Sequence, residues 1–274
     1  MSYATLMVWV NVDHVSKQFV GVAADVADRF AANLIGLSAV AIVPPYVAEG
    51  VAIVGNAAEF DIEQVKASLA EAENKVKAAM GDARRIEWRS VIEYPTETLI
   101  SEARCADLIV IESGRSAGDM YRTADVGAAI LGAGRPFLVV PAAVKSLTAD
   151  HVMIGWKDTR EARRAVQDAL PFLHEAKRVT VLEICEKEQV ETARHHVDDV
   201  VRYLARHRIK AEGRVELIQT SGSRADQIIK WADDEDTDLL VTGAYGHSRL
   251  NEWIFGGMTR DLLATSPICC LMSH

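Results

Sequence analysis

The sequence contains one pattern twice, and this duplication restricts the folds that the chain can adopt. The stretch ADLIVIES at 106–113 is matched by TDLLVTGA at 237–244, so that Asp107 and Asp238 lie 131 positions apart. Pro136 and Pro267, each in front of an apolar run, are also 131 positions apart. A repeat of more than one hundred residues is too long for a solenoid unit, so it predicts two copies of one domain.

The starts of the two copies also match, but at a different spacing. LMVWVN at 6–11 corresponds to VMIGWK at 152–157, an offset of 146. The first copy therefore holds about fifteen extra residues, which we assign to an extended loop at 43–62 that is rich in proline and glycine. The expected domains are 1–143 and 150–274, with a joint near 142–150.

Within each copy, apolar runs of strand length alternate with segments of helical periodicity. This order predicts an α/β fold in which a mostly parallel sheet has helices on both faces. Strands are expected at 6–12, 35–43, 86–92, 108–111, 137–140, 152–156, 179–184, 214–217, 239–242 and 268–272. Helices are expected at 20–34, 62–80, 96–105, 123–131, 160–173, 190–207, 224–232 and 258–265.

A glycine-rich loop in the second copy is the strongest candidate for a ligand site. Gly243 and Gly246 follow the expected strand 239–242, and Gly256 and Gly257 open the expected helix at 258. Ligands of such sheets bind at the carboxyl ends of strands, and a helix start directs free N–H groups at an anion. Further donors could come from three side chains nearby, those of Ser248, Arg249 and Thr259. The alternative is that these glycines serve only turns and caps.

The spacing Gly243-x2-Gly246-x9-Gly256-Gly257 resembles the nucleotide loop of the universal stress protein family, and the duplication resembles its tandem members. The resemblance implies two tandem Rossmann-like domains, each with about five parallel strands. It also implies ATP or a related adenine nucleotide, with or without Mg²⁺. The residues assigned to nucleotide binding on this basis are Trp156, Lys157, Asp158, Ile184, Thr242, Gly243, Gly246, Ser248, Arg249, Gly256, Gly257, Met258 and Thr259.

Two positions depart from the family pattern. Gly257 stands where many members have a serine or threonine, and Thr259 is the nearest hydroxyl. Lys157 stands where many members have an aspartate that helps to hold the adenosine, and the neighbouring Asp158 is the candidate substitute.

The first copy lacks the loop. At the offset of 131, the four glycines correspond to Glu112, Arg115, Asp125 and Val126. Carboxylates at two of these positions would repel phosphate. We therefore expect at most one tightly bound nucleotide per chain, in the second copy.

Net charge and cysteine usage exclude several partners. The formal net charge of −9 disfavours nucleic acid and anionic membranes. No signal peptide or membrane span is evident, and the four cysteines have no metal-binding spacing, so we expect a cytoplasmic protein. His195 and His196 diverge on an expected helix and are interpreted as part of a solvated face, so no metal site is assigned.

The combined hypothesis is a stress-response or regulatory protein that binds nucleotide without fast turnover. No catalytic residues are assigned, because no Walker lysine and no Ser-His-Asp arrangement is found, although slow ATP hydrolysis stays open. The alternatives are a scaffold of the same family that binds no nucleotide and, less favoured, an adenylate-forming enzyme. The last strands of the two copies, 137–140 and 268–272, are expected to pair as in a pseudo-dimer, with a further homodimer left open.

Overall fold

A computed structural model describes residues 2–43, 56–81, 86–114, 119–219, 222–246 and 257–274. The N-terminal half contains β1 (Thr5–Trp9), α1 (Lys17–Arg29), β2 (Asn33–Ala39), α2 (Asn56–Met80), β3 (Glu87–Val91), α3 (Pro95–Glu102), η1 (Ala103–Cys105), β4 (Leu108–Glu112), α4 (Val126–Gly132) and β5 (Phe137–Val140). The C-terminal half contains β6 (His151–Trp156), α5 (Arg160–Asp168), α6 (Leu170–Glu175), β7 (Arg178–Cys185), η2 (Lys187–Gln189), α7 (Val190–Arg206), β8 (Glu212–Leu217), α8 (Arg224–Asp234), β9 (Leu239–Gly243), α9 (Gly257–Thr265) and β10 (Cys269–Ser273).

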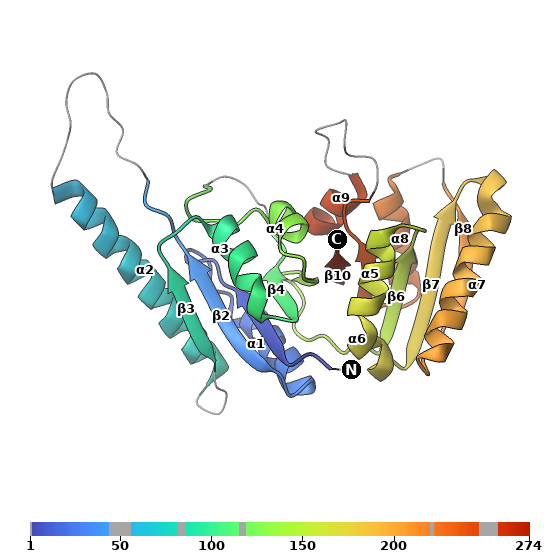
Figure 1. The fold of residues 1–274 in the computed structure, drawn as a ribbon, viewed down its shortest axis with the longest axis horizontal. Helices are drawn as coiled ribbons and strands as arrows, with labels where there is room; N and C mark the ends of the chain where they lie inside the picture. The colour runs from blue at the N-terminus through green and yellow to red at the C-terminus, as the bar shows by residue number, and fades with distance from the viewer. Residues whose placement is uncertain (1, 44–55, 82–85, 115–118, 220–221, 247–256) are drawn as a thin grey trace, which may run out of the picture.

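The ten strands form one continuous sheet in the order β3-β2-β1-β4-β5-β10-β9-β6-β7-β8. All neighbouring strands are parallel except β5 and β10. Each half therefore contributes a five-stranded parallel sheet with one strand order, read outward from the centre as fifth, fourth, first, second and third (Figure 1). Each half of the chain thus has the strand order of a Rossmann-type sheet. The predicted α/β fold class is confirmed.

The two halves are joined through their last strands. β10 pairs antiparallel with β5, with Leu271 opposite Leu138. All four residues of β5 are buried. The pairing expected between these two strands is thus present, and it covers an apolar edge that would otherwise invite aggregation.

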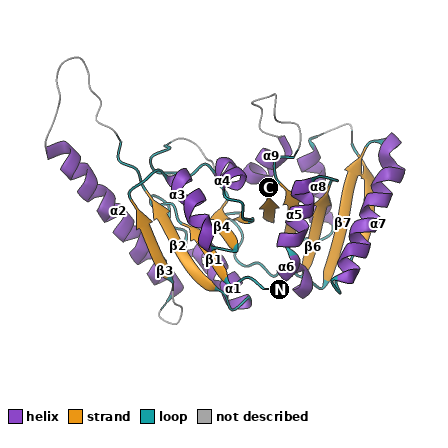
Figure 2. Ribbon diagram, viewed as in Figure 1, coloured by secondary structure: helices purple, strands orange, loops and turns teal. Residues whose placement is uncertain are grey.

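Helices cover both faces of the sheet (Figure 2). Leu6 and Val8 in β1 pack on one face against residues of α1, and the same core cluster includes residues of α5 and α7. Met7 and Trp9 point to the other face, into a core with residues of α3, α4, α8 and α9. This alternation follows from the two-residue period of a strand that is buried on both sides.

Several element boundaries differ from the sequence-based expectation. The first helix begins earlier than expected, because the Ser16 side chain accepts the N–H of Phe19 as its N-cap. It ends at Arg29, since Ala31 has a φ of 50°, and the expected helix over 30–34 is wrong. The expected helix 160–173 is two helices that meet at Ala169. The expected loop at 43–62 is helical from residue 56, and 44–55 lie outside the described residues.

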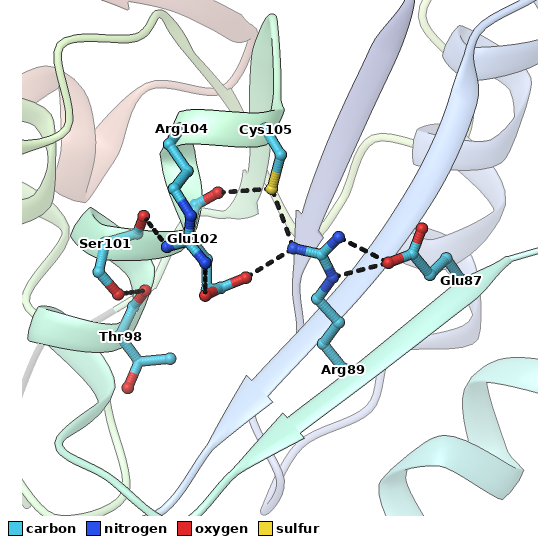
Figure 3. Close-up of polar contacts among 7 residues, drawn as sticks. All are labelled: Glu87, Arg89, Thr98, Ser101, Glu102, Arg104 and Cys105. Atoms are coloured by element: carbon cyan, nitrogen blue, oxygen red, sulfur yellow. Dashed lines mark hydrogen bonds and ion pairs between the residues drawn. The ribbon is translucent and has the colours of Figure 1, made fainter.

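An ion-pair network fastens the edge strand β3 to α3 and η1 (Figure 3). The Arg89 guanidinium donates to the carboxylates of Glu87 and Glu102, the latter at 2.6 Å, and to the Cys105 sulfur at 2.9 Å. Arg104 donates to the other oxygen of Glu102 at 2.7 Å. The side chain of Glu102 is only 15% exposed and accepts from both arginines, so it links the helical segment to the sheet edge.

The four cysteines are free thiols. Burial raises the pKa of both Cys269 and Cys270 to about 12. Within the described ranges, no helix is long and apolar enough to cross a membrane.

Candidate functional site

The candidate site lies where the strand order of the C-terminal half reverses. From β6 the chain crosses to β7 on one side, and from β9 it crosses to β10 on the other side. A cleft of about 710 Å³ opens at the carboxyl ends of β6 and β9. The two strands contribute Trp156 and Gly243 to its wall, and α9 contributes Gly257. Such a reversal point is the usual binding position in open α/β sheets.

Most of the residues assigned from sequence lie together around this cleft. Its wall includes Trp156, Lys157, Asp158, Ile184, Thr242, Gly243, Gly246, Gly257, Met258 and Thr259. The other three, Ser248, Arg249 and Gly256, lie outside the described residues.

The glycines of the loop have different roles. A Cβ on Gly243 would lie 2.6 Å from the backbone nitrogen of Ala162, so this glycine is needed for β9 to pack against the start of α5. At Gly246 and Gly257, the nearest atoms to a Cβ lie at 3.5 and 3.8 Å, so internal packing does not require a glycine there. The positive φ in this turn, 56°, belongs to Tyr245. A glycine that internal packing does not require fits a close approach of a ligand to the backbone.

Thr259 holds the turn in place. Its hydroxyl oxygen accepts the N–H of Tyr245 at 3.2 Å, and Thr259 is buried on the first turn of α9. One of its two lone pairs thus serves the protein itself, and its O–H is able to donate to a phosphate. The helix α9 begins at Gly257, as expected, which places the helix start at the cleft.

The charges around the cleft are mixed. Lys157 and Arg224 bring positive charge to the wall, and Asp261 brings negative charge. Asp158 is paired with Arg163 at 2.5 Å, so its charge is offset on the protein side. Sequence reasoning missed Arg224, which follows the Ser223 N-cap of α8 after β8. The Ser-Arg-Ala-Asp pattern of a capping box after a strand was the available signal.

Sequence reasoning also missed a buried carboxylate behind the loop. Glu161 is 1% exposed, and its Oε2 has no hydrogen-bond partner in the described structure. That oxygen is one of the atoms 3.5 Å from a Cβ built on Gly246. Burial acts to raise the pKa of Glu161, but hydrogen bonds from Arg160, its own backbone N–H and Thr159 outweigh it and lower the pKa below 4.5. A negative charge therefore lies directly beneath the turn.

A second hollow, which shares Lys157, Asp158 and Ile184 with the cleft, lies beside the end of β7 and α7. There Nδ1 of His196 lies 3.5 Å from Oε2 of Glu183, a buried residue of β7. Burial raises the pKa of Glu183. His196 is thus turned toward the sheet, and its assignment to a solvated face is wrong, whereas His195 is 76% exposed. The described residues contain no group of three or more metal-ligating side chains.

The helix start at the corresponding position of the N-terminal half is capped by a side chain. The Asp125 side chain accepts the N–H of Ala128 and caps α4, where the glycine loop would present its helix start. Glu112 takes the place of Gly243 at the end of β4. Val126 is the first residue of α4, and Arg115 lies outside the described residues.

Comparison with known proteins places the C-terminal half in a family. Residues 148–274 match the model of the Universal stress protein family. The match covers the half with the glycine loop and does not include residues 1–147. No curated protein matches the chain.

Solved structures of similar fold cover the whole chain. A universal stress protein from Archaeoglobus fulgidus is 13% identical, with a TM-score of 0.68, and the alignment covers 98% of this chain and 95% of that protein. A putative universal stress protein from Pseudomonas aeruginosa is 16% identical, with a TM-score of 0.60, over 99% of this chain and 93% of that protein. At this identity the likeness concerns the fold, which in both alignments includes the N-terminal as well as the C-terminal half.

Proposed function

We propose that the chain is a tandem universal stress protein that acts in a stress response or in regulation and binds one adenine nucleotide, ATP in the first instance, in the C-terminal cleft. The observation that carries this proposal is a helix start at Gly257, at a strand-order reversal, beside two glycines, Gly246 and Gly257, that internal packing does not require. Backbone N–H groups at such a start suit a phosphate.

The proposed orientation follows from the charges of the wall. The phosphates would lie on the turn at Gly246 and the start of α9, with Lys157 and Arg224 as the nearest cations on the wall. The adenosine would extend along Trp156 toward Ile184, at the ends of β6 and β7. Mg²⁺ accompanying the phosphates would have Asp261 on the same wall as an acidic partner.

Binding without rapid turnover is part of the proposal. Phosphoryl transfer needs a positioned base and strong charge compensation at the phosphates. Of the two aspartates on the wall, Asp158 is engaged by Arg163, and the buried Glu161 adds negative charge beneath the turn. We expect a nucleotide-dependent switch in a cytoplasmic setting, with hydrolysis at most slow.

Isothermal titration with ATP, with and without Mg²⁺, tests the proposal. Gly246→Val should abolish binding while the protein stays folded, since its φ is not positive and a Cβ there makes only ordinary contacts at 3.5 Å. Gly114→Val is the matched control, because Gly114 lies in the N-terminal half with open space around its Cα. Unchanged affinity in Gly246→Val would remove the phosphate assignment. Mass spectrometry of ligand released from the denatured protein identifies the nucleotide, and its absence together with no titration signal would favour the scaffold alternative.

A further inference from the structure

The N-terminal half has a pocket of its own at the equivalent edge of the sheet. It measures about 300 Å³ and opens at the carboxyl ends of β1 and β4, beside the start of α1. Its lining residues include Trp9, Phe19 and Val20, all of which are buried. This volume is at the lower end of the range for small-molecule sites.

One carboxylate oxygen in this pocket lacks a hydrogen-bond partner. Glu112 stands at the end of β4, where the C-terminal half has Gly243, and its side chain is 17% exposed. Its Oε1 is buried and makes no hydrogen bond to any described residue. Nε2 of His14 lies 3.8 Å from its Oε2, and the His14 side chain is 73% exposed. A buried oxygen without a partner is costly, so a ligand that donates to it would be favoured.

Two polar side chains near the pocket are already engaged. Arg122 forms a two-pronged ion pair with Asp13, which uses its positive charge. The amide nitrogen of Asn11 donates to Thr123, and its amide oxygen accepts the N–H of Asp13. The surroundings of Glu112 therefore lack an unpaired arginine or lysine among the described lining residues.

The same surroundings disfavour an anion. Asp125 occupies the N-terminus of α4 by accepting the N–H of Ala128, so the helix start carries a carboxylate of the protein. Together with Glu112, it gives this edge a negative field. A phosphate is thus excluded from the position that it would take in the other half.

We propose that this pocket is a second ligand site, which binds a small organic ammonium ion with an apolar substituent. Glu112 is the counter-ion, and Phe19 and Val20 of α1 provide the apolar surface for the substituent. An ammonium group supplies the hydrogen-bond donor that Oε1 lacks, and aromatic faces attract cations in addition to burying apolar surface.

The electrostatic environment of Glu112 agrees with this assignment. Burial raises the pKa of Glu112, and the opposing effects of His14 and the Ser16 hydroxyl do not cancel it. A bound cation would stabilise the ionised carboxylate and lower the pKa again. The polar groups that face this carboxylate come from the loop after β1 and the start of α1.

The test uses benzylammonium as the probe, with benzyl alcohol as its neutral analogue and benzoate as its anionic analogue, in isothermal titration against the full chain. We expect millimolar binding of benzylammonium alone. Glu112→Gln, which keeps the shape and removes the charge, should weaken it about tenfold or more. Glu63→Gln is the control with the same change in net charge, because Glu63 is exposed on α2.

Each result of these titrations supports or overturns the proposed site. Selective binding of the ammonium probe that is lost in Glu112→Gln and kept in Glu63→Gln supports the site. Equal binding of benzyl alcohol, equal binding by Glu112→Gln, or no heat from benzylammonium up to about twenty millimolar overturns it. Circular dichroism of Glu112→Gln confirms that the variant is folded. If Gly246→Val also leaves benzylammonium binding unchanged, the two sites are distinct.

Discussion

The carboxylate of Asp125 accepts the backbone N–H of Ala128 at 3.0 Å and thereby closes the N-terminus of α4. The corresponding helix of the other half, α9, begins with Gly257 and lines a cleft of about 710 Å³. The two halves share a strand order but differ in what occupies the helix start. In one half a side chain of the protein fills the position that a phosphate would take in the other.

This difference predicts the nucleotide stoichiometry. Equilibrium dialysis with labelled ATP should give at most one tightly bound nucleotide per chain, because the N–H of Ala128 is already engaged and Glu112 adds a second carboxylate nearby. Two equivalent sites per chain would show that the N-terminal half also binds phosphate.

Two glycines of the C-terminal half should respond differently to one added methyl group. Gly243→Ala should lower the free energy of unfolding by about 1–3 kcal/mol, since its Cβ would lie 2.6 Å from the backbone nitrogen of Ala162. Gly257→Ala should change it by less than about 0.5 kcal/mol, because the nearest atom to its Cβ is 3.8 Å away. Urea denaturation measures both, and equal losses would contradict the packing role of Gly243.

The two halves should be coupled through Tyr245 and Gly127. A Cβ on Gly127, in α4, would collide with the hydroxyl of Tyr245, which follows β9. Gly127→Ala should therefore cost about 1–3 kcal/mol of stability. Tyr245→Phe in that background should recover part of the loss, since the ring carbon Cζ is 3.5 Å from the added methyl group.

A double-mutant cycle with Tyr245→Phe alone as the control gives the coupling energy. Strictly additive effects of the two substitutions would contradict a direct contact between residues 127 and 245.

The cysteines should differ sharply in reactivity. Cys269 and Cys270 are buried in the central strand β10, and burial raises the pKa of each thiol to about 12. Iodoacetamide at pH 8 should modify the partly exposed Cys105 in the native protein and leave both β10 thiols unmodified, since the thiolate is the reactive form. Peptide mass spectrometry reads out each position, with alkylation in urea as the control. Rapid labelling of Cys269 in the native state would contradict this placement of β10.

The network at the edge of the sheet should make stability depend on acidity. Burial acts to raise the pKa of Glu102, but hydrogen bonds from Arg89 and Arg104 outweigh this effect. The pKa of Glu102 in the folded protein therefore lies below its ordinary value of 4.5. A carboxylate whose pKa is lower in the folded than in the unfolded protein stabilises the fold at pH values above its unfolded pKa. This stabilisation is lost as the pH falls through the folded pKa.

Glu102→Gln should thus be less stable than the natural chain at pH 7, by about 1–2 kcal/mol. The difference should shrink as the pH falls below about 4.5. Thermal unfolding at several pH values measures this, with Glu97→Gln on the exposed side of α3 as the control. A difference that does not vary with pH would point to packing instead.

Much of the fold could be predicted from the sequence because it depends on short-range patterns. Strands buried on both faces appear as continuous apolar runs, and β5 has the predicted bounds. The constant offset of 131 also fixed which elements correspond, and β4 and β9, like α4 and α9, begin 131 positions apart. The end of α1 was missed because it depends on the left-handed backbone of Ala31, an alanine that carries no turn signal.

The candidate site was predictable where it depends on chain order and missed where it depends on side-chain direction. Residues directly after β6 and β9 had to gather at the carboxyl edge, so Lys157 and Gly246 were found. Arg224 enters from a neighbouring strand-helix connection, and Glu161 turns inward beneath the loop. His196 was assigned to the wrong face, because the pattern of α7 alone does not show that Glu183 faces it from β7.

The antiparallel pairing of β5 with β10 also bears on biosynthesis. As the chain leaves the ribosome, all five strands of the N-terminal half are synthesised long before β10, the strand that pairs with β5. During that interval the apolar edge of Phe137–Val140, fully buried in the finished sheet, has no strand to cover it. The nascent N-terminal half therefore exposes an unpaired apolar strand edge, a feature prone to aggregation, until the second half has been synthesised.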